Sequence, residues 1–316
     1  MFQQILTCIA QYNTIILHRH HKPDGDAMGS QIGLKNLLLE NYPQKRIYVV
    51  GDDPGTYSFM DDSVMDCIPD STYQGALAII LDCGGVNMIC DSRYTLAEKT
   101  VRIDHHLFTG KIADEEVIDS TFESCCGMVT QLAVDGHWKI NPLAAQSLYT
   151  GMVTDSGRFR YDGTTARTHR LASVLLETGF DSNRLFRGLY ADSYENKKLK
   201  ASFILKIRFT PKNNAYIYTT RDEVAELEKQ GIDLFTISRG MVNTMADMKG
   251  VHIWANFTET DKGVQCELRS SMYNINPVAV KYGGGGHQKA SGATVADRET
   301  VMAMLQDLDA IGEDDE

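Results

Sequence analysis

The fold of this chain is clearest around one polar stretch, His18-Arg-His-His-Lys-Pro-Asp-Gly-Asp-Ala-Met-Gly-Ser30. A short apolar run rich in β-branched residues, 14–17, precedes it, and residues 31–40 after it carry Ile and Leu at helical spacing. This order of strand, loop and helix is typical of α/β proteins. In such proteins ligands bind in the loops that leave the carboxyl ends of the strands. The stretch therefore predicts both an α/β fold and a binding site.

The rest of the first half repeats the alternation of strands and helices. Apolar, β-branched runs at 46–50, 76–81 and 100–103 predict three more strands. Residues 142–153 and 166–178 have apolar side chains at helical spacing and predict two helices. We therefore expect a parallel, doubly wound sheet with helices on both faces.

The second half has a different pattern. Residues 187–206 are polar and rich in lysine, which predicts a helical linker, and the segments beyond it alternate as in a mixed sheet. We expect strands at 215–219, 251–257 and 264–269 and helices at 221–230, 235–247 and 298–308. This pattern predicts an α/β domain over 1–186, a helical linker over 187–206 and a smaller α+β domain over 207–316.

The composition excludes several classes of protein. With 316 residues, 43% of them apolar, the chain can bury a sizeable core in one or two domains. Its 31 Lys and Arg against 42 Asp and Glu argue against binding of long nucleic acid through a basic surface. We find neither an apolar run long enough to span a membrane nor a signal peptide, and seven cysteines without a CxxC pair favour reduced thiols. We expect a cytoplasmic protein.

The polar stretch carries donors suited to a metal ion. Asp24 and Asp26 flank Gly25, so a tight turn could aim both carboxylates into one space, and His20 lies four residues before Asp24. Carboxylate oxygens with imidazole and no thiolate suit Mn²⁺ or Mg²⁺, and the nitrogen donors favour Mn²⁺. Taken alone, Asp-Gly-Asp is also a common turn sequence, so a plain turn stays open.

Further acidic residues follow the other predicted strands. Asp82 comes directly after the strand ending at residue 81, Asp104-His-His106 follows the strand ending at 103, and Asp155 closes a helix. Because parallel strands share one carboxyl edge, these carboxylates should meet Asp24 and Asp26. So many carboxylates repel one another unless cations lie between them. The set therefore predicts a pair of divalent ions.

Taken in order, these motifs resemble a known family. His-x-x-Pro-Asp-Gly-Asp-Ala-x-Gly-Ser, Asp-x-Gly, Asp-His-His and Thr-Asp-Ser-Gly resemble the four motifs of the DHH phosphoesterase superfamily. A fifth block, Tyr282-Gly-Gly-Gly-Gly-His-Gln-Lys-Ala-Ser-Gly292, resembles the glycine-rich motif of the DHH-associated C-terminal domain. The chain is most similar to the two-domain bacterial enzymes of this superfamily that degrade nano-RNA and dephosphorylate 3',5'-bisphosphate nucleotides.

The resemblance implies a role for each motif residue. It implies one metal ion held by His20, Asp24 and Asp82, and a second held by Asp26, Asp82, His105 and Asp155. The cofactor would be two Mn²⁺, with Mg²⁺ or another divalent cation as alternatives. Asp82 would bridge the ions, Asp104 would orient a histidine, and His106 would stabilise the phosphoryl oxygens or protonate the leaving oxygen.

The resemblance also implies where substrate binds in the second domain. Glycine amides free of Cβ atoms can curl around an anion, which assigns Gly284, Gly285 and Gly286 to phosphate or base binding together with His287. The resemblance adds Arg269 and Ser270, which end a predicted strand. From the residues alone, the glycine run could equally be a flexible loop and Arg269 an ordinary surface arginine.

These motifs predict an Mn²⁺-dependent phosphoesterase that hydrolyses short oligonucleotides such as pApA, nano-RNA, or the bisphosphate nucleotide pAp. The alternatives are an inorganic pyrophosphatase or exopolyphosphatase, a cyclic-dinucleotide phosphodiesterase, and a catalytically silent nucleotide-binding regulator. A silent regulator should lack a metal ligand, and none of the expected ligands is missing from the sequence. The expected partner is a short oligonucleotide or nucleotide, and a homodimer is compatible with the sequence.

Overall fold

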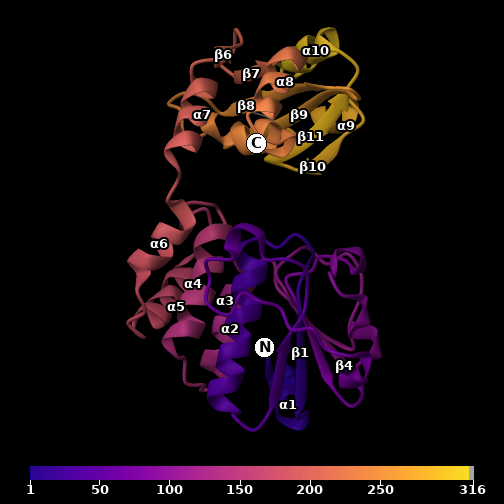
Figure 1. Cartoon of the computed structure of the whole chain (residues 1–316), viewed down its shortest axis with the longest axis vertical. Helices are drawn as coiled ribbons and strands as arrows, with labels where there is room; N and C mark the ends of the chain where they lie inside the picture. Colours follow the sequence, from indigo (N-terminus) through magenta and orange to yellow (C-terminus); the bar gives the residue numbers. More distant parts are fainter. Residues whose placement is uncertain (313–316) are drawn as a thin grey trace. The chain divides into compact units, whose positions relative to one another are not determined.

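The computed structural model of the chain describes residues 1–312, so the last four residues of the predicted second domain lie outside it. The chain forms two compact units, Met1–Ala191 and Asp192–Glu316 (Figure 1). The expected boundaries at 186 and 206 stay a prediction, because this division defines no separate linker. The segment expected as one helical linker contains the end of α6 (Ser182–Tyr190) in the first unit and the whole of α7 (Tyr194–Ile204) in the second.

The first unit is built on a five-stranded parallel sheet, which confirms the α/β prediction. Its strands are ordered β2-β1-β3-β4-β5, with β1 at Thr14–His18, β2 at Arg46–Val49, β3 at Leu77–Leu81, β4 at Lys99–Asp104 and β5 at Glu115–Ile118. Sequence reasoning missed β5, because it begins with two glutamates and none of its residues is fully buried. The strand order reverses between β1 and β3, where open α/β sheets bind ligands.

The two faces of this sheet are covered differently. The main core joins alternate residues of β1, β3 and β4 to six helices, namely α6 and α1 (Gln3–Gln11), α2 (Gly25–Asn41), α3 (Cys125–Asp135), α4 (Pro142–Asp155) and α5 (Ala166–Leu176). On the other face Ile16, Ala78 and Ile80 pack against side chains from the short 3-10 helices Asp70–Tyr73 and Ser92–Leu96. The sheet is therefore buried on both sides, and only its edges and loops reach solvent.

The helix after β1 begins six residues earlier than the apolar pattern predicts. Asp24 is its N-cap, and the Asp24 carboxylate accepts the amides of Asp26 and Ala27 at 3.0 Å each. The expected Asp-Gly-Asp turn is therefore wrong, because this segment is the start of α2. Residues 25–34 are buried on all sides, so no helical periodicity marks them.

Close packing of α2 against α4 explains the glycines of the first turns. A Cβ atom at Gly29 would lie 2.5 Å from the Ser147 carbonyl, and one at Gly33 would lie 2.6 Å from the Leu148 side chain. On α4, a Cβ at Gly151 would meet Cys126 Sγ and would lie 2.7 Å from Asp26 Oδ1. This contact fixes the beginning of α2, and with it the two aspartates.

Replacing Gly151 with alanine is therefore expected to lower the free energy of unfolding of the first unit by about 2–3 kcal/mol, because the added methyl group overpacks a buried contact. Urea unfolding followed by circular dichroism would measure the loss. Gly163→Ala is the matched control, since a Cβ atom there would have its nearest neighbour at 3.7 Å. Equal stability of the two variants would contradict the close approach of α4 to α2.

The second unit is smaller and has a mixed sheet, as expected. Its order is β10-β11-β9-β8-β7-β6, in which only β7 and β8 are parallel neighbours. The strands are β6 (Arg208–Phe209), β7 (Ala215–Thr219), β8 (Ile253–Thr260), β9 (Gly263–Ser270), β10 (Gly285–His287) and β11 (Ala290–Val295). The helices α9 (Asn276–Lys281) and α10 (Arg298–Asp309) cover one face, while α8 (Arg221–Lys229) and part of α7 lie in a separate core with β7.

One predicted helix of the second unit is wrong in type. Residues 235–247 contain a π-helical turn, Thr236–Gly240, followed by a 3-10 turn, Asn243–Met245, in place of a regular α-helix. Buried Asn256 of β8 holds the π-helical turn through its side-chain amide, which donates to the carbonyls of Ile237 and Ser238 at 2.8 and 2.6 Å. The turn is thus fixed to the sheet by polar bonds that the apolar pattern does not encode.

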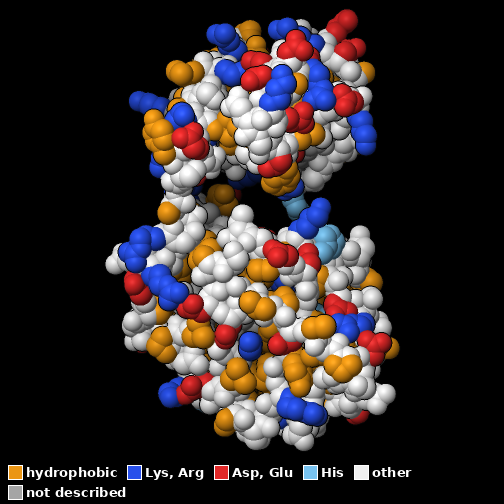
Figure 2. Space-filling model, in the orientation of Figure 1, with side chains coloured by type: hydrophobic (Ala, Val, Ile, Leu, Met, Phe, Trp, Pro, Cys, Tyr) orange, Lys and Arg blue, Asp and Glu red, His pale blue; other side chains and the backbone are white. Residues whose placement is uncertain are grey.

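Two surface properties bear on partners. Among residues 1–312, no helix is both long enough and apolar enough to cross a membrane. Lys and Arg side chains are interspersed with Asp and Glu over the face shown in Figure 2, rather than forming one broad basic surface.

Candidate metal centre

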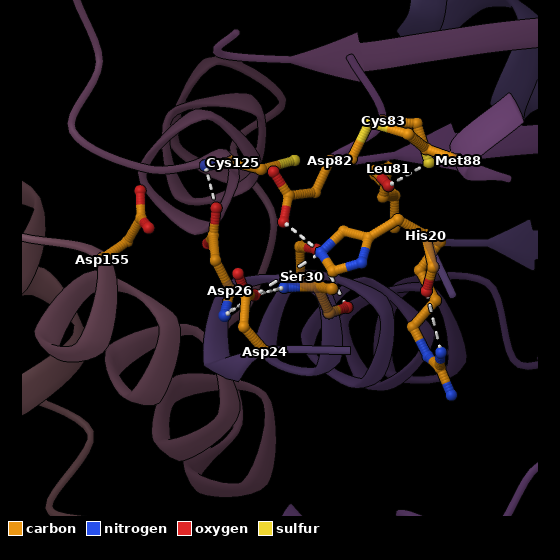
Figure 3. A network of polar contacts seen from close by, with 12 residues as sticks. His20, Asp24, Asp26, Ser30, Leu81, Asp82, Cys83, Met88, Cys125 and Asp155 are labelled. Carbon is orange, nitrogen blue, oxygen red and sulfur yellow. Dashed lines mark hydrogen bonds and ion pairs between the residues drawn. The ribbon is translucent and has the colours of Figure 1, made fainter. Parts of the chain in front are cut away.

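The first group of donors lies where β1, α2 and β3 meet. His20 Nε2 is 3.5 Å from Asp82 Oδ2 and 3.7 Å from Asp24 Oδ1, and Figure 3 shows the His20 ring directed between these carboxylates. The other ring nitrogen, Nδ1, lies 2.9 Å from the His21 carbonyl. A proton on Nδ1 leaves the Nε2 lone pair free for a cation. His20, Asp24 and Asp82 can thus hold one ion.

The second group lies beside the first. His105 Nε2 is 3.4 Å from Asp155 Oδ2, 3.7 Å from Asp26 Oδ2 and 3.6 Å from Asp82 Oδ1. These side chains come from the loop after β4, the end of α4 and the first turn of α2. Asp26, His105 and Asp155 are close enough to hold one ion. The structure thus brings all six predicted metal ligands into two adjacent groups.

Asp82 lies between the two groups. Its Oδ2 faces His20 and its Oδ1 faces His105, and Oδ1 is buried without a hydrogen-bond partner. Its backbone has φ of +55°, a left-handed conformation that costs a non-glycine residue about 1–3 kcal/mol. A buried, unpaired carboxylate oxygen is costly unless a cation neutralises it. The donors therefore fit one divalent cation on each side of Asp82.

The pKa values of the clustered aspartates and histidines reflect the crowding of negative charge around Asp82. Burial, together with Asp82 and other carboxylates, raises the pKa of Asp155 to about 7 and that of Asp26 well above its usual value. The pKa values of the two imidazoles rise as well: burial opposes their charged form, but the adjacent carboxylates raise the pKa of His20 to about 11 and that of His105 to about 10. Without metal, the cluster must retain protons that divalent cations would displace.

The N-terminus of α3 supports Asp26 in a way that sequence reasoning missed. The amides of Cys125 and Cys126 donate to the two Asp26 oxygens at 2.7 and 2.9 Å, and Asp26 is only 1% exposed. Ser124 caps the same helix by accepting the Gly127 amide. The positive end of the helix thus favours the ionised form of Asp26. A serine before an apolar run was the one sequence signal of this helix start.

Asp104 and His106 form a separate pair beside the cluster. His106 Nδ1 donates to Asp104 Oδ1 at 2.7 Å, and Asp104 Oδ2 accepts from Arg102 Nη2 at 2.5 Å. The Asp104 bond is the largest cause of a raised pKa at His106, whose side chain is 38% exposed. The histidine that Asp104 orients in this structure is thus His106. Arg102 was missed, because a fully buried arginine inside a strand has no distinguishing pattern.

In the second unit, strand pairing aligns Arg269 with His287. Arg269 of β9 pairs with Ala290 of β11, which pairs in turn with His287 of β10. Residues paired across antiparallel strands point to the same face, so Arg269 and His287 share one row of the sheet. Arg269 also forms an ion pair with Glu267 at 3.1 Å. The Ser270 hydroxyl accepts the amides of Met272 and Tyr273, so it closes a turn.

The glycine run is an edge strand and its turn, which corrects the alternative of a flexible loop. Gly285–His287 forms β10 against β11. A Cβ atom at Gly284 would collide with the Gly292 carbonyl, and one at Gly286, where φ is +137°, would lie 2.6 Å from the Ala290 carbonyl. Glycine is therefore required by close backbone approach. As an edge strand of the sheet, β10 leaves backbone amides on its outer side for a ligand.

The first unit has a parallel sheet whose carboxyl edge carries two adjacent groups of aspartates and histidines. The second unit has a mixed sheet with a glycine edge strand. These features together are typical of a metal-dependent phosphoesterase. The family model for the DHH family, N-terminal domain, matches residues 14–152, and that for the DHHA1 domain matches residues 234–314. The chain belongs to the DHH family of phosphoesterases and is a hydrolase of phosphate esters.

Two curated relatives match over nearly their whole length. The chain is 35% identical to the bifunctional oligoribonuclease and PAP phosphatase NrnA of Bacillus subtilis, over 98% of each chain. It is 34% identical to the probable bifunctional oligoribonuclease and PAP phosphatase NrnA of Streptococcus mutans, over 97% of this chain and 98% of the relative. A solved exopolyphosphatase-related protein from Bacteroides fragilis shares the fold, with a TM-score of 0.84, 22% identity, and coverage of 98% and 95%.

Proposed function

We propose that this protein hydrolyses short oligonucleotides and 3',5'-bisphosphate nucleotides such as pAp, using two Mn²⁺ ions. The observation that carries the proposal is the placement of Asp82, whose two oxygens face separate histidine and carboxylate groups. The named activities of the Bacillus and Streptococcus relatives, which match over nearly the whole chain, support the choice of substrate.

Each side chain has a distinct role in this proposal. Divalent ions held by these residues would supply an activated water and would neutralise the charge that develops on the phosphate. Asp82 would hold both ions, with His20 and Asp24 on one side and Asp26, His105 and Asp155 on the other. His106 donates a hydrogen bond or a proton to a phosphoryl oxygen or to the leaving oxygen. Asp104 accepts the hydrogen bond from His106 Nδ1 and keeps the ring in place.

The choice of Mn²⁺ rests on the donors. Four carboxylates and two imidazole nitrogens per pair of ions suit a metal that accepts both oxygen and nitrogen, whereas Mg²⁺ strongly prefers oxygen. Chelated protein should be inactive and should recover most activity with Mn²⁺. Recovery with Mg²⁺ alone, at equal concentration and to a higher rate, would overturn the assignment of the ion.

The substrate is tested with a panel of phosphate esters. We expect kcat/KM in Mn²⁺ to be highest for pApA, short RNA or pAp and lower for cyclic dinucleotides and pyrophosphate. If kcat/KM is highest for pyrophosphate, the pyrophosphatase alternative is favoured. If it is highest for cyclic dinucleotides, the cyclic-dinucleotide phosphodiesterase is favoured. Nucleotide binding without turnover of any member would favour the silent regulator, which the complete set of ligands argues against.

The second unit is proposed to bind the nucleotide through Arg269 and His287, which share one row of the sheet. Arg269→Ala should raise KM for pAp about tenfold or more, with kcat within about threefold, because a charge-assisted hydrogen bond to phosphate contributes about 1.5–3 kcal/mol. His287→Ala removes an exposed side chain of the same row and should act in the same direction. Steady-state kinetics would measure both effects.

Arg221→Ala provides the control, since Arg221 pairs with Asp261 on the surface of the same unit. Its KM should match that of the wild type. An unchanged KM in both Arg269→Ala and His287→Ala would remove this row from the substrate site. The assignments of Gly284, Gly285, Gly286 and Ser270 would then lose their support as well.

Location and assembly stay predictions. We propose a cytoplasmic enzyme, in keeping with its expected nucleotide substrates. Dimerisation is tested by light scattering of the purified chain, for which a mass of 35.2 kDa marks the monomer and twice that value the dimer.

A further inference from the structure

A pocket beside His106 is not used by the mechanism above. It has a volume of about 390 Å³ and is lined by His106, Phe108, Glu116, Ile118 and Ser120. The pocket lies at the carboxyl ends of β4 and β5, within the first unit. Its volume falls in the range of small-molecule sites. His106 both lines this pocket and is the residue proposed to contact the phosphate, so the two sites share a side chain.

The loop that forms one wall exposes two large apolar side chains in succession. Leu107 is 76% exposed and Phe108 is 63% exposed. Exposed apolar side chains gathered at a concave site are more informative than single ones scattered over a surface. Phe108 lines the pocket, whereas Leu107 does not. The two neighbours therefore differ in what they can contact.

Polar bonds hold this loop in place on both sides of its apolar tip. Before the tip, His106 is bonded to Asp104; after it, the Thr109 hydroxyl donates to the Gly84 carbonyl at 2.6 Å. Farther along, Glu116 Oε1 accepts the amides of Ile112 and Ala113 at 2.8 and 3.2 Å. The Phe108 ring is thus presented to solvent by an anchored loop rather than by a free one.

We propose that this pocket binds the base of the nucleoside whose phosphate lies at His106, with the base stacked on the ring of Phe108. The inference rests on the proposed function and adds a base subsite in the first unit. An aromatic ring stacks on the face of any base, which suits an enzyme that accepts short oligonucleotides of varied sequence. The Ser120 hydroxyl, also at the pocket, can bond to a base edge.

The chemistry of the pocket favours a base over other occupants. Phosphate or pyrophosphate gains nothing from an exposed phenyl ring, because such anions bind to charges and amide dipoles. A ribose presents mostly hydroxyl groups. A base offers a flat apolar face for Phe108 and Ile118 and polar edges for the hydroxyl of Ser120.

Two substrates and three variants test the proposal. The substrates are pAp and its abasic analogue, in which a tetrahydrofuran ring replaces the adenosine. Phe108→Ala should lower kcat/KM for pAp about tenfold, mainly through KM, and should change the abasic analogue by less than about twofold. Phe108→Trp should restore pAp hydrolysis, because it keeps an aromatic face. Leu107→Ala, the neighbouring exposed position, should match the wild type on both substrates.

Equal losses on both substrates in Phe108→Ala would show that the ring only supports the loop, and no loss on pAp would remove it from the site. Binding of 5'-AMP, followed by calorimetry, separates this inference from the proposed function. If the wild type fails to hydrolyse pAp, the proposed function fails, but tenfold weaker 5'-AMP binding in Phe108→Ala with unchanged binding of inorganic phosphate would still support the base subsite. Equal 5'-AMP affinity in the two proteins would overturn it.

Discussion

Asp82→Asn is expected to lower kcat by about 1,000-fold or more, with loss of both metal ions. Asparagine has nearly the same size, so the fold should survive, but it carries no charge and only one oxygen. It cannot neutralise cations on both sides, as the two Asp82 oxygens are placed to do. Loss of several kcal/mol of charge stabilisation corresponds to this change in rate. Metal analysis and steady-state kinetics would measure both effects.

Asp135→Asn is the matched control for this prediction. Asp135 is exposed at the end of α3 and undergoes the same change of charge without facing the cluster. Its metal content and kcat should equal those of the wild type. Retention of two ions and of substantial Mn²⁺-dependent turnover in Asp82→Asn would refute the bridging role.

His106→Ala should lower kcat by about 100- to 10,000-fold while the protein keeps both metal ions. The expected loss is that of a positioned proton donor at the reacting phosphate. His106 donates Nδ1–H to Asp104, which leaves Nε2 for the substrate. Its side chain is 38% exposed, so its removal should leave stability nearly unchanged.

Metal content decides between two roles for His106. Asp82, His105 and His106 also lie close enough together to hold a cation, so a loss of one ion in His106→Ala would make His106 a metal ligand. His169→Ala, an exposed histidine on α5, is the control and should retain full activity. Unchanged kcat in His106→Ala would contradict both roles.

The sequence predicted the sheet and the meeting of the aspartates and histidines at its edge because both depend on local patterns. Short apolar runs define β1, β3 and β4, and a polar residue directly after a parallel strand must lie at the carboxyl edge of the sheet. Asp82 and His105 follow such strands, so their meeting could be anticipated. The order β2-β1-β3-β4-β5, which places β1 beside β3, depends on packing between distant segments and is not written in any one of them.

Three features of the candidate sites could not be predicted because they involve the backbone or burial on all sides. Residues 25–30 are buried all round and lack helical periodicity, so the start of α2 resembled a turn. The support of Asp26 comes from the amides of Cys125 and Cys126, and an amide carries no side-chain signature. In the same way, the pairing of the glycine run as β10 depends on β11 and not on the run itself.

Titration of the metal-free protein with Mn²⁺, followed by electron paramagnetic resonance, tests the central claim most directly. Two ions held by the two oxygens of Asp82 would lie close enough to couple magnetically. We predict that two equivalents of Mn²⁺ bind per chain and give the spectrum of a coupled pair, and that Asp82→Asn abolishes it. Binding of a single equivalent, or of two ions that keep the six-line spectrum of isolated Mn²⁺, would contradict the two-metal site.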